Sequence, residues 1–249
     1  IKLHCNPDGH FPHNPEPLKE NLTDLSKKVI SSGADFGIAV DPDVDRLAFM
    51  DENGILFGEE YTLVACADYV LSIKKGNTVS NLSSTRALRD VTEKHGGVYT
   101  SSAVGEVNVV EMMKNTNAII GGEGNGGIIL PDSHYGRDAI VGIVLFLSLL
   151  AEKKISVSSL KSTYPLYFMT KKKIDLNSDI DLDGLLATIE KKYENESLNT
   201  IDGVKIDFQD SWVHLRKSNT EPIIRIYTEA TSQEEADVLA DRFITELKA

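Results

Sequence analysis

Between residues 36 and 153, short apolar runs typical of strands alternate with stretches whose apolar residues recur at helical spacing, and this alternation constrains the fold more than any other feature. The strand-like runs are FGIAV, LAFM, TVSNL, VYTS and NAII, at residues 36–40, 47–50, 78–82, 98–101 and 117–120. One helical stretch begins at residue 59, and three more occupy residues 85–94, 106–114 and 137–153. Strands and helices that alternate at this interval predict a layered α/β unit.

The pattern changes from about residue 163, where β-type segments dominate. These segments lie at residues 164–174, 201–208, 212–216 and 223–229, with one helical stretch at 182–193. A final helix is signalled by Ser232 and Glu235, which match a capping box. We therefore expect the fold class α/β, with mixed α/β sheet domains followed by a smaller α+β C-terminal domain.

Composition and charge exclude several classes of protein. Apolar residues make up 41% and charged residues 26% of the 249 residues, which is typical of a folded globular protein. A net charge of −12 disfavours a nucleic-acid or anionic-membrane partner, and no apolar stretch is long enough to span a membrane. The two cysteines, Cys5 and Cys66, indicate no disulfide scaffold, so we expect a cytoplasmic location.

An acidic loop, DPDVDR at residues 41–46, follows the first strand-like run. Asp41, Asp43 and Asp45 would repel one another strongly unless a positive charge lay between them, and oxygen ligands alone suit a hard cation such as Mg²⁺. Arg46 adds a fixed positive charge suited to a phosphate. A solvated acidic turn is the alternative.

Two known motifs share this spacing. An EF-hand loop would use Glu52 at position 12, but it requires glycine where Arg46 stands, and the flanks predict strands. A phosphatase with an aspartate nucleophile would use an Asp-x-Asp pair after a strand, although Asp45 stands where such enzymes carry threonine or valine. The phosphatase stays open as an alternative.

A glycine-rich loop, GGEGNGG at residues 121–127, follows NAII. The next residues, IILPD, cannot open a helix, so the dinucleotide-binding context fails, and the lack of a following lysine excludes a P-loop. Glycines flanking Glu123 and Asn125 would let the backbone approach a ligand while the two side chains bind neighbouring hydroxyls, as in a sugar site. A glycine-rich hairpin turn is the alternative.

A basic loop, RKSNTEPIIR at residues 216–225, lies between two β-type segments. Its hydrogen-bond donors suit a phosphate better than a general surface role in an acidic chain. The donors are Arg216, Ser218, Asn219, Thr220 and Arg225.

Together DPDVDR, GGEGNG and RKSNTEP, in this order, resemble the α-D-phosphohexomutase superfamily, which includes phosphoglucomutase, phosphomannomutase and phosphoglucosamine mutase. The resemblance covers essentially the whole chain. HCNPDGHFPHNPEPLKENL and SSTRALRD are also similar, the latter closest to the bacterial phosphoglucosamine/phosphomannomutase type.

The resemblance implies a four-domain enzyme in which a phosphoserine of the first domain exchanges a phosphoryl group with a hexose phosphate through a bisphosphorylated sugar. Residues 1–57 would be the C-terminal part of domain II, residues 58–162 domain III and residues 163–249 domain IV. By position, the three aspartates of the acidic loop would hold Mg²⁺, Arg46 would be catalytic beside the phosphoserine, and Glu123 and Asn125 would bind the sugar 3- and 4-hydroxyls. The basic loop would bind the phosphate that is not transferred, through Arg216, Ser218, Asn219 and Thr220.

Several positions depart from the family pattern. The serine loop, roughly TASHNP, has no counterpart here, and Pro12 stands where the serine would be. We therefore expect a fragment that binds a hexose phosphate but is inactive without the N-terminal domains of the same enzyme. A non-catalytic sugar-phosphate-binding module is the alternative. Residues that differ from common family members leave the choice of hexose open, and these are Ser83, Glu106, Asn125 and Gly127.

Overall fold

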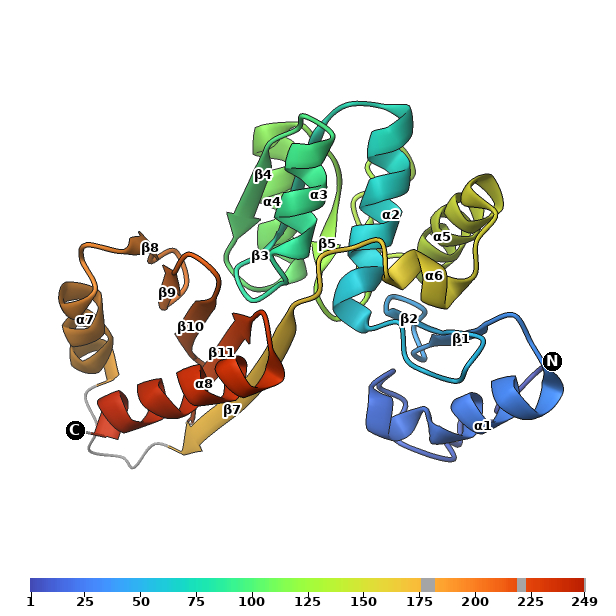
Figure 1. Ribbon diagram of the computed structural model, residues 1–249, viewed down its shortest axis with the longest axis horizontal. Coiled ribbons are helices and arrows are strands. Elements are labelled where there is room, and N and C mark those ends of the chain that lie inside the picture. Colours follow the sequence, from blue (N-terminus) through green and yellow to red (C-terminus); the bar gives the residue numbers. More distant parts are fainter. Residues whose placement is uncertain (176–181, 219–222, 249) are drawn as a thin grey trace. The chain divides into compact units, whose positions relative to one another are not determined.

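The computed structural model describes residues 1–175, 182–218 and 223–248. By its contacts the chain divides into two compact units (Figure 1). The first contains Ile1–Ser101 and Gly105–Pro165, and the second contains Ser102–Val104 and Leu166–Ala249.

The first unit alternates helices and strands, as the hydrophobic pattern predicts. Its elements are η1 (Lys19–Asn21), α1 (Thr23–Ser32), β1 (Gly37–Val40), β2 (Leu47–Met50), α2 (Glu59–Ile73), β3 (Asn77–Asn81), α3 (Ala87–Lys94), β4 (Tyr99–Ser102), α4 (Glu106–Thr116), β5 (Ala118–Glu123), β6 (Gly127–Ile129), α5 (Ala139–Lys153) and α6 (Val157–Lys161).

A four-stranded sheet in the order β4-β3-β5-β6 forms the centre of this unit. Strands β3 and β5 run parallel, while β5 and β6 form an antiparallel hairpin. Side chains alternate across β3, so that Val79 contributes to a core with Met113 of α4, while Thr78 bonds to Thr92 of α3 on the other face. Helices α3 and α4 therefore cover opposite faces of the sheet.

The antiparallel pair β1-β2 is attached to this sheet through β2. The backbone N–H of Leu47 donates to the Gly126 carbonyl at 3.2 Å. Phe49 of β2 stacks on Phe146 of α5 with ring centroids 3.7 Å apart, and Phe57 meets the same ring edge-on. The acidic and glycine-rich loops are thereby held within one compact unit.

The second unit is a five-stranded sheet in the order β7-β11-β10-β9-β8. Alternate residues of β9, β10 and β11 form one core with α7 and α8, including Ile206, Leu215, Ile226 and Phe243. Both helices therefore cover the same face of the sheet. Its elements are β7 (Phe168–Asp175), α7 (Leu182–Lys192), β8 (Ser197–Asn199), β9 (Val204–Asp207), β10 (Trp212–Lys217), β11 (Ile223–Ala230) and α8 (Gln233–Lys248).

Sequence patterns located most elements and misplaced some ends. The helix expected from residue 137 begins at Ala139, because the side chain of Asp138 caps it by accepting the N–H of Val141. The strand expected from residue 164 begins at Phe168. At the start of α8, the hydroxyl of Ser232 accepts the N–H of Glu235, in agreement with the predicted capping box. Helices α1 and α6 and strands β6 and β8 lacked a signal strong enough to predict them.

Among the described residues, no helix combines the length and the apolar character that crossing a membrane requires.

Candidate functional site

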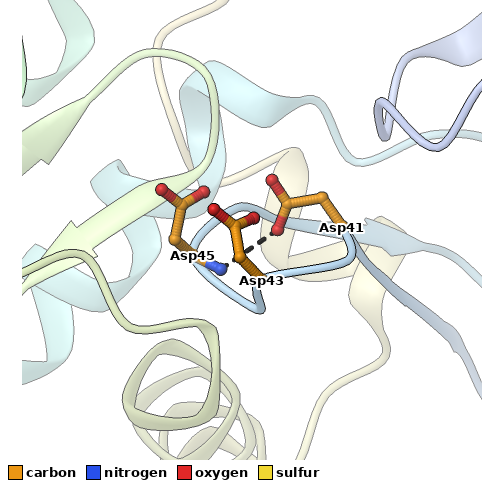
Figure 2. Close-up of side chains that lie close together, drawn as sticks. All are labelled: Asp41, Asp43 and Asp45. Carbon is orange, nitrogen blue, oxygen red and sulfur yellow. Dashed lines mark hydrogen bonds between the residues drawn. The ribbon is translucent and has the colours of Figure 1, made fainter.

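The acidic loop joins β1 to β2 and brings three carboxylates together. One carboxylate oxygen from each of Asp41, Asp43 and Asp45 lies within 4.8 Å of the other two, and Figure 2 shows all three carboxylates on the same side of the loop. The loop is tight because the N–H of Asp45 donates to Asp41 Oδ1 at 3.0 Å and Val44 has a left-handed φ of 59°. Asp41 is buried and Asp43 is exposed, so the cluster faces solvent at Asp43.

Neighbouring aspartates of the loop have pKa shifts in opposite directions. Burial alone would raise the pKa of Asp41, but hydrogen bonds from Arg46 and Asp45 outweigh it and lower that pKa below its ordinary value. Burial raises the pKa of Asp45 to about 6 against the attraction of Arg137, and the neighbouring carboxylates of Asp41 and Asp43 add to the rise. A carboxylate in these surroundings gains from a nearby cation.

Asp45 also offers an oxygen for coordination. Its Oδ1 is buried and accepts no hydrogen bond from any residue that the structure describes. The three carboxylates supply only oxygen ligands, which suit Mg²⁺. The donor set and this buried oxygen therefore fit a divalent cation.

Arg46 is engaged with carboxylates. Its Nε donates to Asp41 Oδ2 at 2.6 Å and its Nη1 donates to Glu16 Oε1 at 2.7 Å. Glu52, the position-12 residue of the rejected EF-hand alternative, instead accepts the N–H of Ser158 at the start of α6. Glu52 is therefore bound to a helix end rather than to the acidic cluster.

The glycine-rich loop forms the turn of the β5-β6 hairpin. The alternative given for this segment, a glycine-rich hairpin turn, is therefore correct as a description of its fold. The hairpin turn follows Glu123, the last residue of β5, and Asn81 ends the parallel neighbour β3. Because carboxyl ends of parallel strands meet at one sheet edge, the two side chains are adjacent. Asn81 Nδ2 donates to Glu123 Oε1 at 2.9 Å, and the N–H of Gly105 donates to the same oxygen at 3.2 Å.

The backbone of this loop approaches its surroundings closely. Gly126 has a φ of +89°, and a Cβ there would lie 2.2 Å from the Leu47 carbonyl oxygen. Asn125 Oδ1 accepts the N–H of Gly127 at 3.1 Å, while its Nδ2 donates to no residue in the described part of the chain. Asn125 therefore presents an amide donor next to the buried carboxylate of Glu123.

Sequence reasoning missed Arg137 of this site, as it missed Asn81. The Arg137 guanidinium pairs with Asp45 of the acidic loop, with Glu123 at 2.9 Å and with Glu106 at 3.3 Å. In the sequence, Arg137 is marked only by lying directly before Asp138, the N-cap of α5, and this position does not indicate a binding role. Ser83, also singled out in the sequence, is buried and donates its N–H to Asn81 Oδ1 at 2.9 Å.

In the second unit, cationic side chains form a row across three strands. Arg216 of β10 is paired with Arg225 of β11, which is paired with Lys173 of β7. Directly opposed residues share a face of the sheet, and this is the face opposite the α7 and α8 core. The Nη1 of Arg216 lies 3.4 Å from Asp202 Oδ2, and the Nη1 of Arg225 donates to the Tyr227 hydroxyl at 3.3 Å.

The two ends of the basic loop converge at its base. The N–H of Ser218, which is buried, donates to the Ile223 carbonyl at 3.0 Å. Asn219 and Thr220, also predicted to bind phosphate, lie outside the described residues. Lys173 was not predicted from the sequence as a binding residue, although its side chain extends the row of Arg216 and Arg225.

Comparisons with known proteins agree along almost the whole chain. A family model described as phosphoglucomutase/phosphomannomutase, alpha/beta/alpha domain II matches residues 1–54. The corresponding models for alpha/beta/alpha domain III and for the C-terminal domain match residues 50–167 and 173–246.

Individual relatives point the same way. A phosphoglucomutase/phosphomannomutase of Thermococcus kodakarensis is 37% identical over 95% of this chain and 52% of its own length. A protein of Methanopyrus kandleri named probable phosphoglucosamine mutase is 34% identical over 98% of this chain and 55% of its own length. The chain thus spans about half the length of these relatives.

Solved structures share the fold. A phosphoglucomutase/phosphomannomutase family protein of Burkholderia thailandensis has a TM-score of 0.84 and 29% identity, covering 97% of this chain and 53% of its own. The Aspergillus fumigatus N-acetylphosphoglucosamine mutase, solved with GlcNAc-6P and magnesium, has a TM-score of 0.63 and covers 84% of this chain and 51% of its own. At 18% identity the second likeness shows the fold alone.

Proposed function

Because this chain belongs to the phosphoglucomutase/phosphomannomutase family, we propose that it forms the metal-, sugar- and phosphate-binding part of a phosphohexomutase. Such an enzyme interconverts hexose 6-phosphate and hexose 1-phosphate by intramolecular phosphotransfer, here with glucosamine, mannose or glucose phosphate. The clustering of the Asp41, Asp43 and Asp45 carboxylates within 4.8 Å is the observation that carries the proposal.

The acidic loop would hold Mg²⁺ through these three aspartates. The buried Oδ1 of Asp45, which lacks a hydrogen-bond donor among the described residues, supports this assignment. When bound, the ion supplies positive charge that stabilises a phosphoryl group in transfer. Arg46 would lie beside that phosphoryl group, with its orientation fixed by Asp41 and Glu16.

The glycine-rich loop would bind the sugar ring. Glu123 is held by Asn81 and Arg137, so its carboxylate is oriented before a ligand arrives. Asn125 offers its amide donor to a neighbouring hydroxyl. Phosphate would bind at the basic loop, where the arginine fork suits a bidentate contact. The residues proposed there are Arg216, Ser218, Asn219, Thr220 and Arg225.

The phosphatase alternative is disfavoured by the state of its nucleophile. Asp41 is only 2% exposed, and both of its carboxylate oxygens accept hydrogen bonds, one from the Arg46 side chain and the other from the N–H groups of Asp45 and Arg46. Attack on phosphorus would require a phosphoryl group to reach this carboxylate, which is more buried than those of Asp43 and Asp45. Release of inorganic phosphate from a sugar phosphate, abolished by Asp41→Asn, would nevertheless restore this alternative.

The partners we propose are a hexose phosphate and the N-terminal domains that would carry the serine. No TASHNP-like segment occurs in the 249 residues, so we infer that the chain alone binds its ligand without interconverting it. A sugar-phosphate-binding module makes the same prediction for the chain alone. The two differ when a separately produced N-terminal half of a relative is added, because only the mutase would then convert the ligand.

Free thiols at Cys5 and Cys66 support a cytoplasmic location.

Calorimetric titration tests the binding proposal. The chain would be titrated with glucosamine 6-phosphate, glucose 6-phosphate and mannose 6-phosphate in the presence of Mg²⁺. We expect Arg216→Ala and Glu123→Gln each to weaken binding about tenfold to a hundredfold, since each removes charged hydrogen bonds. Arg89→Ala, at a solvent-accessible arginine of α3 whose Nε lies 3.8 Å from its neighbour Asp90, is the matched control. Equal affinity in all variants would count against the proposal.

A further inference from the structure

Arg137 lies where the acidic and glycine-rich loops meet. Its Nη2 pairs with Asp45 Oδ2 and its Nη1 with Glu123 Oε2 at 2.9 Å. Its Nε lies 3.3 Å from Glu106 Oε2, and its backbone N–H donates to Glu106 Oε1 at 3.0 Å. A single guanidinium thus faces carboxylates from the acidic loop, the end of β5 and the start of α4.

The stem of Arg137 is fixed by its neighbours. A Cβ at Gly127 would lie 2.4 Å from Arg137 Cδ, so the arginine stem runs against bare backbone. The following residue, Asp138, caps α5 by accepting the N–H of Val141 at 3.0 Å. The Arg137 side chain is 19% exposed, which limits screening of its charge by water. Its position is therefore determined by the hairpin and by the helix start.

Arg137 would affect ligand binding at Asp45 and at Glu123 in opposite directions. A divalent cation held by Asp45 would compete with the guanidinium for the same carboxylate, and the two positive charges would repel each other. A sugar bound to Glu123 would instead benefit, because Arg137 fixes the direction of that carboxylate. The planar fork of arginine can serve both carboxylates at once, which a lysine ammonium cannot.

We propose that Arg137 is a positioning residue that competes with a divalent cation for Asp45 and orients Glu123 toward the sugar. The inference rests on the proposed function, since it takes Asp45 as a metal ligand and Glu123 as a sugar ligand. It assigns one side chain opposite effects on the two ligands of the site. A merely structural arginine would affect both ligands in the same direction.

The test compares cation and sugar-phosphate binding in the 249-residue chain and three variants. Mn²⁺ binding is measured by the loss of the free-ion electron paramagnetic resonance signal, and glucose 6-phosphate binding by calorimetry at saturating Mg²⁺. In Arg137→Met we expect Mn²⁺ to bind about tenfold tighter, because a competing positive charge is gone. We expect glucose 6-phosphate to bind about tenfold weaker, because Glu123 loses its charged hydrogen bond.

Arg137→Lys separates charge from geometry. It keeps the positive charge, so Mn²⁺ affinity should stay within about threefold of the unmodified chain, while glucose 6-phosphate affinity should still fall because the fork is lost. Arg89→Met is the matched control and should change neither affinity. Thermal unfolding provides a second readout if Arg137→Met is destabilised, because added Mn²⁺ should raise its unfolding temperature more than that of the unmodified chain.

Two results would overturn the inference and are distinguishable from failure of the proposed function. If the unmodified chain binds Mn²⁺ and glucose 6-phosphate but Arg137→Met weakens both or alters neither, Arg137 does not have the proposed role. If the unmodified chain binds neither ligand, the proposed function fails and the inference fails with it.

Discussion

Arg216 of β10 lies directly opposite Arg225 of β11 in the antiparallel register. Like charges in this arrangement destabilise a sheet, and Lys173 extends the row to a third strand. The Asp202 carboxylate lies near Arg216, and the Tyr227 hydroxyl accepts from Arg225. An anion placed between the arginines would relieve the repulsion, so ligand binding and stability should oppose each other at these positions.

Arg225→Gln should separate the two effects. We expect hexose-phosphate affinity to fall about tenfold or more, because a charged donor is lost. The free energy of unfolding without ligand should stay the same or rise by up to about 1 kcal/mol, because a like-charge pair is removed. Lys217→Gln is the control, since Lys217 is exposed and lies on the other face of β10. Calorimetry and urea unfolding measure both quantities, and an equal loss of affinity in the control would contradict a specific role.

Mg²⁺ should bind weakly to the chain alone, with a dissociation constant of about 10⁻⁴ M or higher, because this ion relies on substrate phosphates as well as carboxylates. Arg46 engages Asp41 and Arg137 engages Asp45, which leaves the exposed Asp43 as the most accessible ligand. Asp43→Asn should therefore weaken binding further without affecting folding. Asp132→Asn, at an exposed aspartate, is the control. Micromolar affinity in the unmodified chain, measured by calorimetry, would contradict this expectation.

Gly126→Ala should destabilise the first unit by about 3–5 kcal/mol, since it adds backbone strain and a steric clash. The φ of Gly126 is +89°, and its Cβ would lie 2.2 Å from the Leu47 carbonyl oxygen. Gly9→Ala is an informative comparison, because Gly9 also has a positive φ of +78° but no atom within 4 Å of the added Cβ. That variant should lose only about 1 kcal/mol. If urea unfolding showed similar losses of unfolding free energy in Gly126→Ala and Gly9→Ala, the clash with Leu47 would contribute little to the destabilisation.

Acid should destabilise the second unit through His214. Burial lowers the pKa of His214 to about 4, although its Nε2 lies 2.7 Å from the Asp202 carbonyl oxygen that it can donate to. In the unfolded chain a histidine has a pKa of about 6.5. Between these values the unfolded chain binds a proton that the folded chain does not, so stability falls as the pH decreases from about 6.5 toward 4.

His214→Gln removes this titration while keeping a side-chain donor. The loss of unfolding free energy between pH 7 and pH 5 should be about 2 kcal/mol smaller in the variant than in the unmodified chain. His10→Gln, at an exposed position, shows whether loss of any histidine alters the profile. If the free energy of unfolding changed with pH equally in the unmodified chain and in His214→Gln, His214 would not be the cause of the acid destabilisation.

Local patterns in the sequence predicted the elements well where they encode periodicity or caps. The β1-β2 pair, α2, β3 and α8 lie where apolar spacing and the Ser232 cap indicated. Strand β6 was not predicted because three residues after a glycine-rich turn carry no periodic signal, and its pairing with β5 depends on tertiary contacts.

The site was only partly predictable for a related reason. Asp41, Asp43 and Asp45 share one short loop, so their proximity follows from the sequence. Arg137 lies 92 residues from Asp45 and reaches it only through the fold. Asn81 had a usable signal, because it ends a strand parallel to the one that carries Glu123. Contacts across separate elements thus account for most of what sequence reasoning missed.

The backbone hydrogen bond from Leu47 to Gly126 has a consequence for building chimaeras from members of this family. A crossover near residues 54–58 would separate β2 from the hairpin and helix it contacts, so that Phe49 of one parent would have to fit Phe146 of another. A crossover after Pro165 would leave the contacts within the first unit intact, and in the second unit it would divide only the contacts of Ser102–Val104 from the rest. Recombination at Pro165 should therefore yield folded hybrids more often than recombination near residues 54–58, where the domain II and domain III models meet.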